Sequence, residues 1–276
     1  MKKAMDFLKK QPMLSGVIAL ALSVLAIKII PQGSFGVKCL LRILMCGTML
    51  VFLYLISGEK TPSMSDNRTG YVIKAGLGLW IVAAIMGLMA FIPQLFADGG
   101  LPEGWLKRLI VLFFMFLFGC LFEELCFRAV LNDAIVYQFR NSKHVFLVSA
   151  VVTSLVFGLV HVMGSSLTSA LEWAQAGMKT LQTAIIGFAF LILYWKTRNI
   201  WACGIVHGIF DFLTELSLAF SESAKIGAGT YVQGGNDGKA AVGFYAVTIL
   251  FNLVITLRIW HKVGKTIDFE QMRRTW

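Results

Sequence analysis

Residues 106–139 read LKRLIVLFFMFLFGCLFEELCFRAVLNDAIVYQF. The stretch is strongly apolar and no proline interrupts it, so we expect one continuous helix. At 1.5 Å per residue this helix would extend about 50 Å, whereas the hydrocarbon core of a bilayer is about 30 Å thick. We therefore predict a single helix that crosses a membrane and projects beyond it.

The whole chain has the composition of a polytopic membrane protein. Of its 276 residues, 57% are hydrophobic and only 14% are charged, whereas a soluble domain carries about 25% charged residues. The alternation of polar and apolar positions that is typical of a transmembrane barrel is absent. The sequence thus predicts an all-α bundle of transmembrane helices that forms a single membrane domain over residues 1–276.

Apolar runs separated by Gly, Pro and charged clusters predict about eight spans. They lie near residues 13–30, 38–57, 71–97, 106–139, 144–164, 181–195, 200–220 and 240–260. The more polar tract SSLTSALEWAQAGMKT (165–180) is predicted to be a loop or an interfacial helix, and GAGTYVQGGNDGKA (227–240) a flexible loop. The first apolar run continues past the tripeptide Ala-Leu-Ala at 19–21, which loosely resembles a signal-peptide cleavage site. We therefore expect an uncleaved helix.

The formal net charge of +10 is explained by topology. With the N-terminus inside, the cytoplasmic connections hold 14 Lys and Arg residues and the outer connections hold 6. This bias predicts a multi-pass protein of the cell membrane with both termini cytoplasmic. No basic patch is interleaved with aromatic residues, so we expect contact with membrane lipid and not with nucleic acid. The sequence leaves the oligomeric state open.

Six ionisable residues interrupt three of the predicted spans. They are Glu123, Glu124 and Arg128 in GCLFEELCFRAVL, His161 in VFGLVHV, and His207 with Asp211 in GIVHGIFDF. A charged group in hydrocarbon costs several kcal/mol unless it faces a protein interior or a water-filled cavity. We therefore expect a polar site within the bilayer whose carboxylates and imidazoles are suited to hydrolysis.

The spacing on the fourth span separates the roles of the two glutamates. Glu124 and Arg128 are four residues apart and share a helix face, which favours a structural ion pair. Glu123 is rotated about 100° away, so its carboxylate is free for general-base chemistry. The alternative is a buried ion pair that only fixes helix packing, with a spare polar residue beside it.

The histidines allow both structural and chemical interpretations. His161 is a lone histidine in an apolar span, where a packed, hydrogen-bonded role is common. His207 and Asp211 share a helix face, so the carboxylate could fix the imidazole tautomer, or both could bind a metal. Gly204 and Gly208 lie on roughly the same face and would allow close helix approach, which plain packing would also use.

Five cysteines occur in apolar runs and none forms a CxxC pair. They are typical of small buried hydrophobic residues. Cys120 and Cys126 flank the glutamate pair and could line the site.

Taken together, the order EExxxR, FxxxH and HxxxD on separate spans resembles the CPBP family of intramembrane proteases, which includes the CAAX prenyl endopeptidases and the bacterial Abi proteins. The motifs comprise Glu123, Glu124, Arg128, Phe157, His161, His207 and Asp211. The resemblance covers about 105–220 and implies that this region is the catalytic core of an eight-helix fold. It also implies an endopeptidase that acts on a membrane-associated peptide or lipid-linked protein.

The resemblance further implies that Glu123 and His161 activate a water that attacks the peptide carbonyl. His207 and the residue at 211 would stabilise the oxyanion, and Glu124 with Arg128 would support them. Two interpretations of metal use stay open. In one, Glu123, His161, His207 and Asp211 ligate Zn²⁺; in the other, the glutamate acts without a metal.

Asp211 departs from the asparagine that many family members carry. An amide can donate a hydrogen bond to an oxyanion, but an ionised carboxylate cannot. Asp211 must therefore be protonated, orient His207 or bind a cation.

Two other functions stay open at this point. One is a non-proteolytic protein of the same fold, either an acyl-transfer enzyme acting on lipid-linked protein or a partner in a bacteriocin or signalling system. The other is a proton-relaying transporter, although the sequence shows no inverted repeats.

Overall fold

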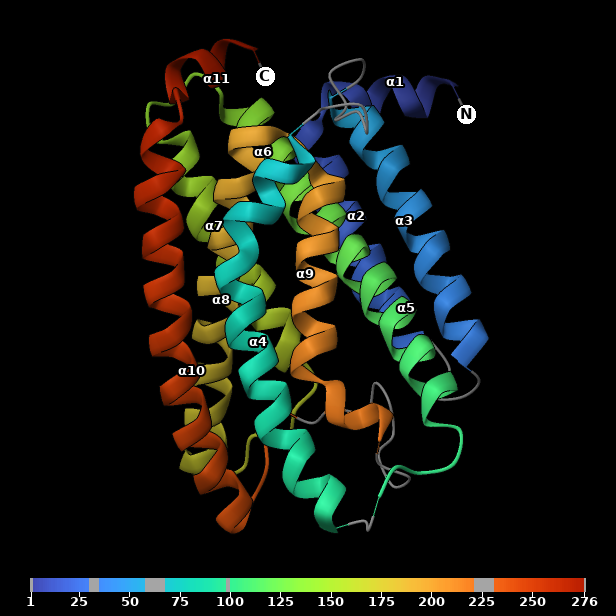
Figure 1. Cartoon of the computed structure of the whole chain (residues 1–276). Helices are drawn as coiled ribbons and strands as arrows, with labels where there is room; N and C mark the ends of the chain where they lie inside the picture. Colours follow the sequence, from blue (N-terminus) through green and yellow to red (C-terminus); the bar gives the residue numbers. More distant parts are fainter. Residues whose placement is uncertain (1, 30–34, 58–67, 98–99, 221–230, 276) are drawn as a thin grey trace.

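In the computed structural model the chain is described over residues 2–29, 35–57, 68–97, 100–220 and 231–275. These residues fold into a helical bundle without β-strands (Figure 1). The α-helices are α1 (Lys2–Lys10), α2 (Pro12–Ile29), α3 (Phe35–Ser57), α4 (Thr69–Ala97), α5 (Trp105–Glu124), α6 (Asn132–Phe139), α7 (Val145–Val162), α8 (Ala170–Thr197), α9 (Ile200–Thr214), α10 (Gly235–Lys262) and α11 (Phe269–Thr275). The all-α prediction is confirmed.

Each of the eight predicted spans is helical in the residues described. Six helices are long and apolar enough to cross a membrane, whereas Pro12–Ala26 and Ile200–Thr214 form shorter apolar helices. The chain is thus a multi-pass membrane protein. The helices α1 and α11 lie at the same end of the bundle (Figure 1), so the two chain ends lie on one side.

Residues 105–139 form one unbroken helical rod, as predicted from the absence of proline. The rod is not regular, because a π-helical segment, η2 (Leu125–Leu131), joins α5 to α6. The π-helical segment follows directly after the glutamate pair. Such segments are rare and occur often at functional sites.

Two tracts, one predicted to be a loop or an interfacial helix and the other a flexible loop, are partly helical. The tract 165–180 supplies the first turns of α8, which begins at Ala170 after a capping box between Ser169 and Glu172. Similarly, α10 begins at Gly235, so the last part of the tract 227–240 is helix, while 227–230 lie outside the described residues. The predicted span 200–220 ends earlier than expected, because α9 stops at Thr214 and a 3₁₀ turn, η3 (Leu216–Ala219), follows.

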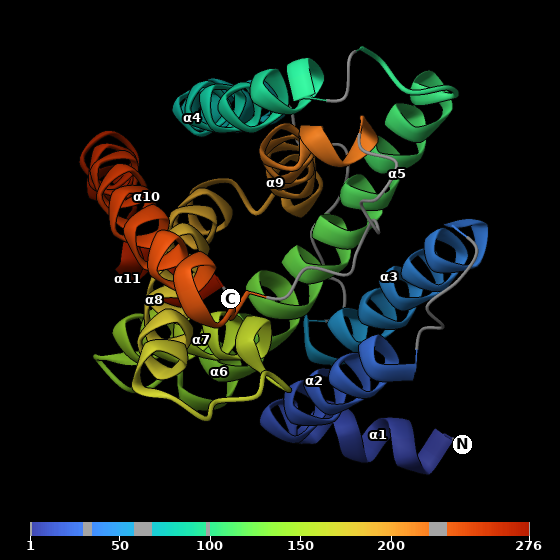
Figure 2. The same cartoon turned by 90° about the horizontal axis from the view of Figure 1, so that it is seen from below.

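Viewed along the bundle, α9 lies between α4 and α5 (Figure 2). Two glycines allow α9 to approach α5 closely. A Cβ added at Gly204 would lie 2.7 Å from a Leu121 methyl carbon, and one added at Gly208 would lie 2.9 Å from the Leu117 Cα. The predicted role of these glycines in close helix approach is therefore confirmed, and it brings the polar face of α9 against the glutamates of α5.

A buried polar cluster fixes the end of the bundle that carries α1 and α11. The Asp133 carboxylate is fully buried and accepts two hydrogen bonds from the Arg198 guanidinium, at 2.8 and 2.9 Å. Asn132 accepts hydrogen bonds from Ser149 and Trp195. These bonds tie α6 to α7 and to the end of α8, below which the candidate site lies.

Candidate active site

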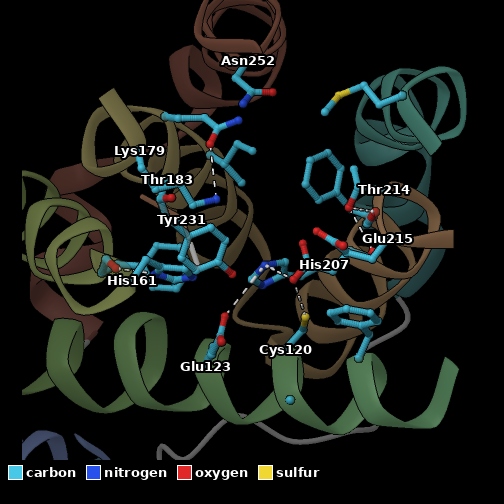
Figure 3. A pocket seen from close by; sticks show the side chains of 18 of the residues that line it. Cys120, Glu123, His161, Lys179, Thr183, His207, Thr214, Glu215, Tyr231 and Asn252 are labelled. Atoms are coloured by element: carbon cyan, nitrogen blue, oxygen red, sulfur yellow. Dashed lines mark hydrogen bonds and ion pairs between the residues drawn. The ribbon is translucent and has the colours of Figure 1, made fainter. Parts of the chain in front are cut away.

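A cavity of about 830 Å³ opens inside the bundle, and five of the seven motif residues line it. Its wall includes Glu123, Phe157, His161, His207 and Asp211 (Figure 3). Glu124 and Arg128 are fully buried behind this wall. The three motif-bearing segments, which are far apart in sequence, therefore converge on one cavity.

The predicted ion pair between Glu124 and Arg128 is present. The Arg128 Nε atom lies 3.4 Å from the Glu124 Oε2 atom, and the guanidinium lies over the Phe157 ring, 3.9 Å from its centroid. The pair is enclosed, because Glu124 is 0% and Arg128 is 1% exposed. Arg128 thus neutralises a carboxylate that would otherwise be very costly to bury.

Glu124 also makes a contact that the sequence did not indicate. Its Oε1 atom accepts a hydrogen bond from His207 Nδ1 at 2.8 Å. An ionised carboxylate can only accept, so Nδ1 carries the proton and Nε2 faces the cavity. Of the alternatives left open for Asp211, control of this tautomer does not fit the structure, since Asp211 Oδ2 lies on the Nε2 side, at 3.7 Å.

Glu123 faces the cavity, as predicted from its position on the helix. Its Oε2 atom lies 4.0 Å from His207 Nε2, and it accepts no hydrogen bond from the residues described. The separation leaves Glu123 outside the Glu124–Arg128 pair. A carboxylate placed in this way has a lone pair available to a water molecule.

His161 is anchored by its own helix. Its Nδ1 atom lies 2.8 Å from the Phe157 carbonyl oxygen, which can only accept, so Nδ1–H is the donor. The Nε2 atom is then an acceptor. The phenylalanine of the FxxxH motif therefore holds the histidine through its backbone, while its ring supports Arg128.

Cys120 is the site residue that motif spacing missed. It lies one helical turn before Glu123 and its thiol donates to Asp211 Oδ2 at 3.2 Å. This bond uses Asp211 as an acceptor. The expectation from the flanking positions holds for Cys120, which lines the cavity, whereas Cys126 contacts Ser23 behind the helix.

Further polar residues line the cavity away from the motifs. They are Arg42, Lys179, Gln182, Thr183, Thr214, Glu215, Tyr231, Gln233 and Asn252. Burial raises the pKa of the Tyr231 phenol well above its ordinary value, so this side chain stays neutral. The cavity wall is therefore polar over a much larger area than the motifs alone indicate.

One group of side chains fits a metal ion. Donor atoms of Cys120, His207 and Asp211 all lie within 4.8 Å of one another. Around a tetrahedral Zn²⁺ with bonds of about 2.0–2.3 Å, neighbouring donors are about 3.3–3.8 Å apart, close to the 3.2 and 3.7 Å found here. Glu123 could supply a fourth donor at the His207 side. Among the described residues this group contains Cys120 in place of the predicted His161.

The fold and the cavity define a class of protein: a polytopic helical membrane protein whose spans enclose a cavity lined by carboxylates and imidazoles. Residues 104–213 match the sequence model of the family described as type II CAAX prenyl endopeptidase Rce1-like. The matched region contains all three motifs, so the family match agrees with the resemblance drawn from them. Comparisons with curated proteins and with solved structures found no match.

Proposed function

We propose that the chain is an intramembrane endopeptidase that hydrolyses a peptide bond in a membrane-associated, lipid-linked protein or peptide. One observation supports this proposal above all: the Glu123 carboxylate and the His207 imidazole, 4.0 Å apart, face one cavity enclosed by transmembrane helices. The family match supports proteolysis as the reaction class.

In the proposed reaction, Glu123 is the general base. Its carboxylate takes a proton from a water molecule, and the resulting hydroxide attacks the peptide carbonyl carbon. His161 Nε2, which is an acceptor, orients the same water. Glu123 then delivers its proton to the leaving amine when the carbon–nitrogen bond breaks.

His207 is the proposed oxyanion stabiliser. In its imidazolium form, Nδ1–H remains bonded to Glu124 and Nε2–H donates to the developing oxyanion. Asp211 does not donate in this scheme. It lies beside Nε2 and stabilises the positive charge of the imidazolium, which explains why a carboxylate can replace the more common amide.

Glu124 and Arg128 are positioning residues in this proposal, because both are buried behind the cavity wall. The predicted metal role also stays a proposal. Cys120, His207, Asp211 and Glu123 would hold Zn²⁺, which, when bound, would lower the pKa of a water molecule toward neutrality. The alternative is the metal-free reaction, in which Glu123, His161 and His207 have the roles described above.

The proposed location is the cell membrane, with both termini cytoplasmic. The Lys and Arg bias supports this orientation. In this orientation the end of α9 and the start of α10, next to which the cavity-lining residues Glu215 and Gln233 lie in the chain, would face away from the cytoplasm (Figure 1).

The test uses purified protein in detergent and a panel of peptides that contain a prenylated cysteine near the C-terminus. We expect mass spectrometry to detect backbone cleavage by the wild type and a loss of about 10²–10⁴-fold in rate for Glu123→Gln. Unchanged cleavage by Glu123→Gln would refute the proposed base. A product that gains an acyl mass without backbone cleavage would instead support an acyl-transfer enzyme.

A further inference from the structure

Tyr231 brings a phenol hydroxyl into the candidate active site that the proposed reaction does not use. It lies outside the family-matched region 104–213, on the short stretch 231–234 that precedes α10, and it lines the cavity. Figure 3 shows Tyr231 between His161 and His207, with its hydroxyl oxygen directed toward His207. The hydroxyl therefore lies on the side of the cavity where the proposed reaction takes place.

The backbone that carries Tyr231 is held by hydrogen bonds from two helices. Its carbonyl oxygen accepts a hydrogen bond from the Tyr245 hydroxyl of α10 at 2.7 Å. Two residues further along the chain, the backbone of Gln233 forms two hydrogen bonds with the side-chain amide of Gln175 on α8, at 2.7 and 2.9 Å. The Lys179 Nζ atom lies 4.2 Å from the centroid of the Tyr231 ring. The phenol is thus a positioned group, as a preorganised donor of an active site must be.

The Tyr231 hydroxyl is a neutral donor that is free to bind a ligand. None of the residues that the structure describes forms a hydrogen bond with its oxygen. Burial raises the pKa of the phenol well above its ordinary value, and the Asp211 and Glu215 carboxylates raise it further, so the proton stays on the oxygen. The centroid of its ring lies 6.1 Å from that of His161, which orients the attacking water in the proposed reaction.

Asp211 leaves the proposed oxyanion with one donor fewer than the family pattern implies. The resemblance implies that His207 and an amide at position 211 stabilise the oxyanion together. An ionised carboxylate at 211 has acceptor oxygens only. His207 is then the single donor assigned to an oxygen that can accept hydrogen bonds from more than one group.

We infer that Tyr231 is a catalytic residue that donates a hydrogen bond to the oxyanion, in place of the amide that Asp211 lacks. This inference rests on the proposed function and deepens it, because it adds a contact to the reacting atoms from outside the family-matched region. When water attacks, the π electrons of the carbonyl group move to its oxygen, to which Tyr231 O–H and His207 Nε2–H donate. The phenol keeps its proton, and the electrons return when the carbon–nitrogen bond breaks.

The first test compares Tyr231→Phe with the wild type on a prenylated peptide that the wild type cleaves. The exchange removes one oxygen atom and keeps the ring. We expect kcat to fall by about 10²–10³-fold, as for other oxyanion-hole donors, while KM changes by less than about threefold. Tyr71→Phe is the matched control, because it removes the same group from an exposed position in α4, and it should keep the wild-type kcat. An unchanged kcat in Tyr231→Phe would overturn the inference.

A rescue experiment separates the loss of a donor from a change in packing. Asp211→Asn places an amide donor on α9, at the position where the family pattern has one. Added to Tyr231→Phe, it should raise kcat by about tenfold or more, because the amide replaces the missing hydroxyl. A packing defect at Tyr231 would not be repaired in this way, so a double variant no faster than Tyr231→Phe would overturn the assigned role.

A binding measurement separates this inference from the proposed function. A fluorescent phosphinate peptide has a tetrahedral, negatively charged group in place of the scissile amide, and an isostere with –CH₂–CH₂– at that position has no such oxygen. Fluorescence anisotropy should show that Tyr231→Phe binds the phosphinate about tenfold or more weakly than the wild type and binds the isostere equally well.

The Tyr231-dependent affinity for the phosphinate would support the oxyanion donor even if the wild type cleaves no peptide, a result that would count against the protease alone. Equal affinity of the wild type and Tyr231→Phe for the phosphinate, or no binding to either protein, would overturn the oxyanion donor.

Discussion

Replacing Glu124 or Glu123 by the isosteric glutamine should have different consequences: the first variant should lose stability, and the second should stay stable but lose activity. Glu124→Gln leaves the Arg128 guanidinium buried without a counter-charge, since Arg128 is 1% exposed and its Nη1 and Nη2 atoms have no other hydrogen-bond partner among the described residues. Removing one member of a buried ion pair costs about 3–5 kcal/mol. Glu123→Gln breaks no such pair, so its free energy of unfolding should change by less than about 1 kcal/mol.

The assay is reversible unfolding by SDS in mixed micelles, combined with the peptide-cleavage measurement. We expect Glu124→Gln to be destabilised and Glu123→Gln to be stable but inactive. The double variant Glu124→Gln/Arg128→Met is the control, because it removes both charges and should regain part of the stability lost in Glu124→Gln. Equal stability of the two single variants would refute the division of roles between Glu123 and Glu124.

Three further predictions follow from the packing, the donor groups and the burial of Glu215. Gly208→Ala places a Cβ 2.9 Å from the Leu117 Cα, so α9 should shift from α5 with a cost of about 1–3 kcal/mol and reduced cleavage; Gly177→Ala, which meets no atom within 4 Å, should leave both unchanged. Protein loaded with Co²⁺ should show a near-ultraviolet thiolate-to-cobalt absorption band that Cys120→Ser abolishes and His161→Ala retains, and absence of the band in the wild type would favour the metal-free reaction. Burial raises the pKa of Glu215 above its ordinary value, so ionisation opposes folding as pH rises through the folded-state pKa. Glu215→Gln should therefore unfold like the wild type at low pH and become the more stable protein at higher pH, and a stability difference that is independent of pH would contradict this reasoning.

Local geometry explains what the sequence predicted correctly at the site. The Glu124–Arg128 pair follows from a four-residue spacing within one helix, and so does the separate direction of Glu123. The bond between Glu124 and His207 joins residues 83 positions apart and depends on the packing of α5 against α9. No spacing within one helix indicates this bond. The sequence instead suggested that Asp211, which lies in α9 with His207, could fix the tautomer of the His207 imidazole.

The polar tract 165–180, before the sixth predicted span, shows a second limit of prediction from the sequence. Its polarity indicated a loop, yet Gln175 and Lys179 belong to the first turns of α8. The S-x-x-E pattern at Ser169–Glu172 was the local signal for a helix start. Polarity that is typical of solvent exposure can also come from a helix face that lines an internal cavity, and only the packed structure separates the two.

The π-helical segment Leu125–Leu131 affects how the fold should respond to a change in the number of residues. A π turn contains about one residue more than an α turn, and one residue corresponds to about 100° of helical rotation. The segment lies between Glu123, which precedes it in the chain, and Asp133, which follows it. Because the extra residue is taken up within one turn, losing a single amino acid there would let the helix relax to ordinary α geometry while its two halves keep nearly the same directions, so this stretch should tolerate a one-residue deletion better than the regular helix before it.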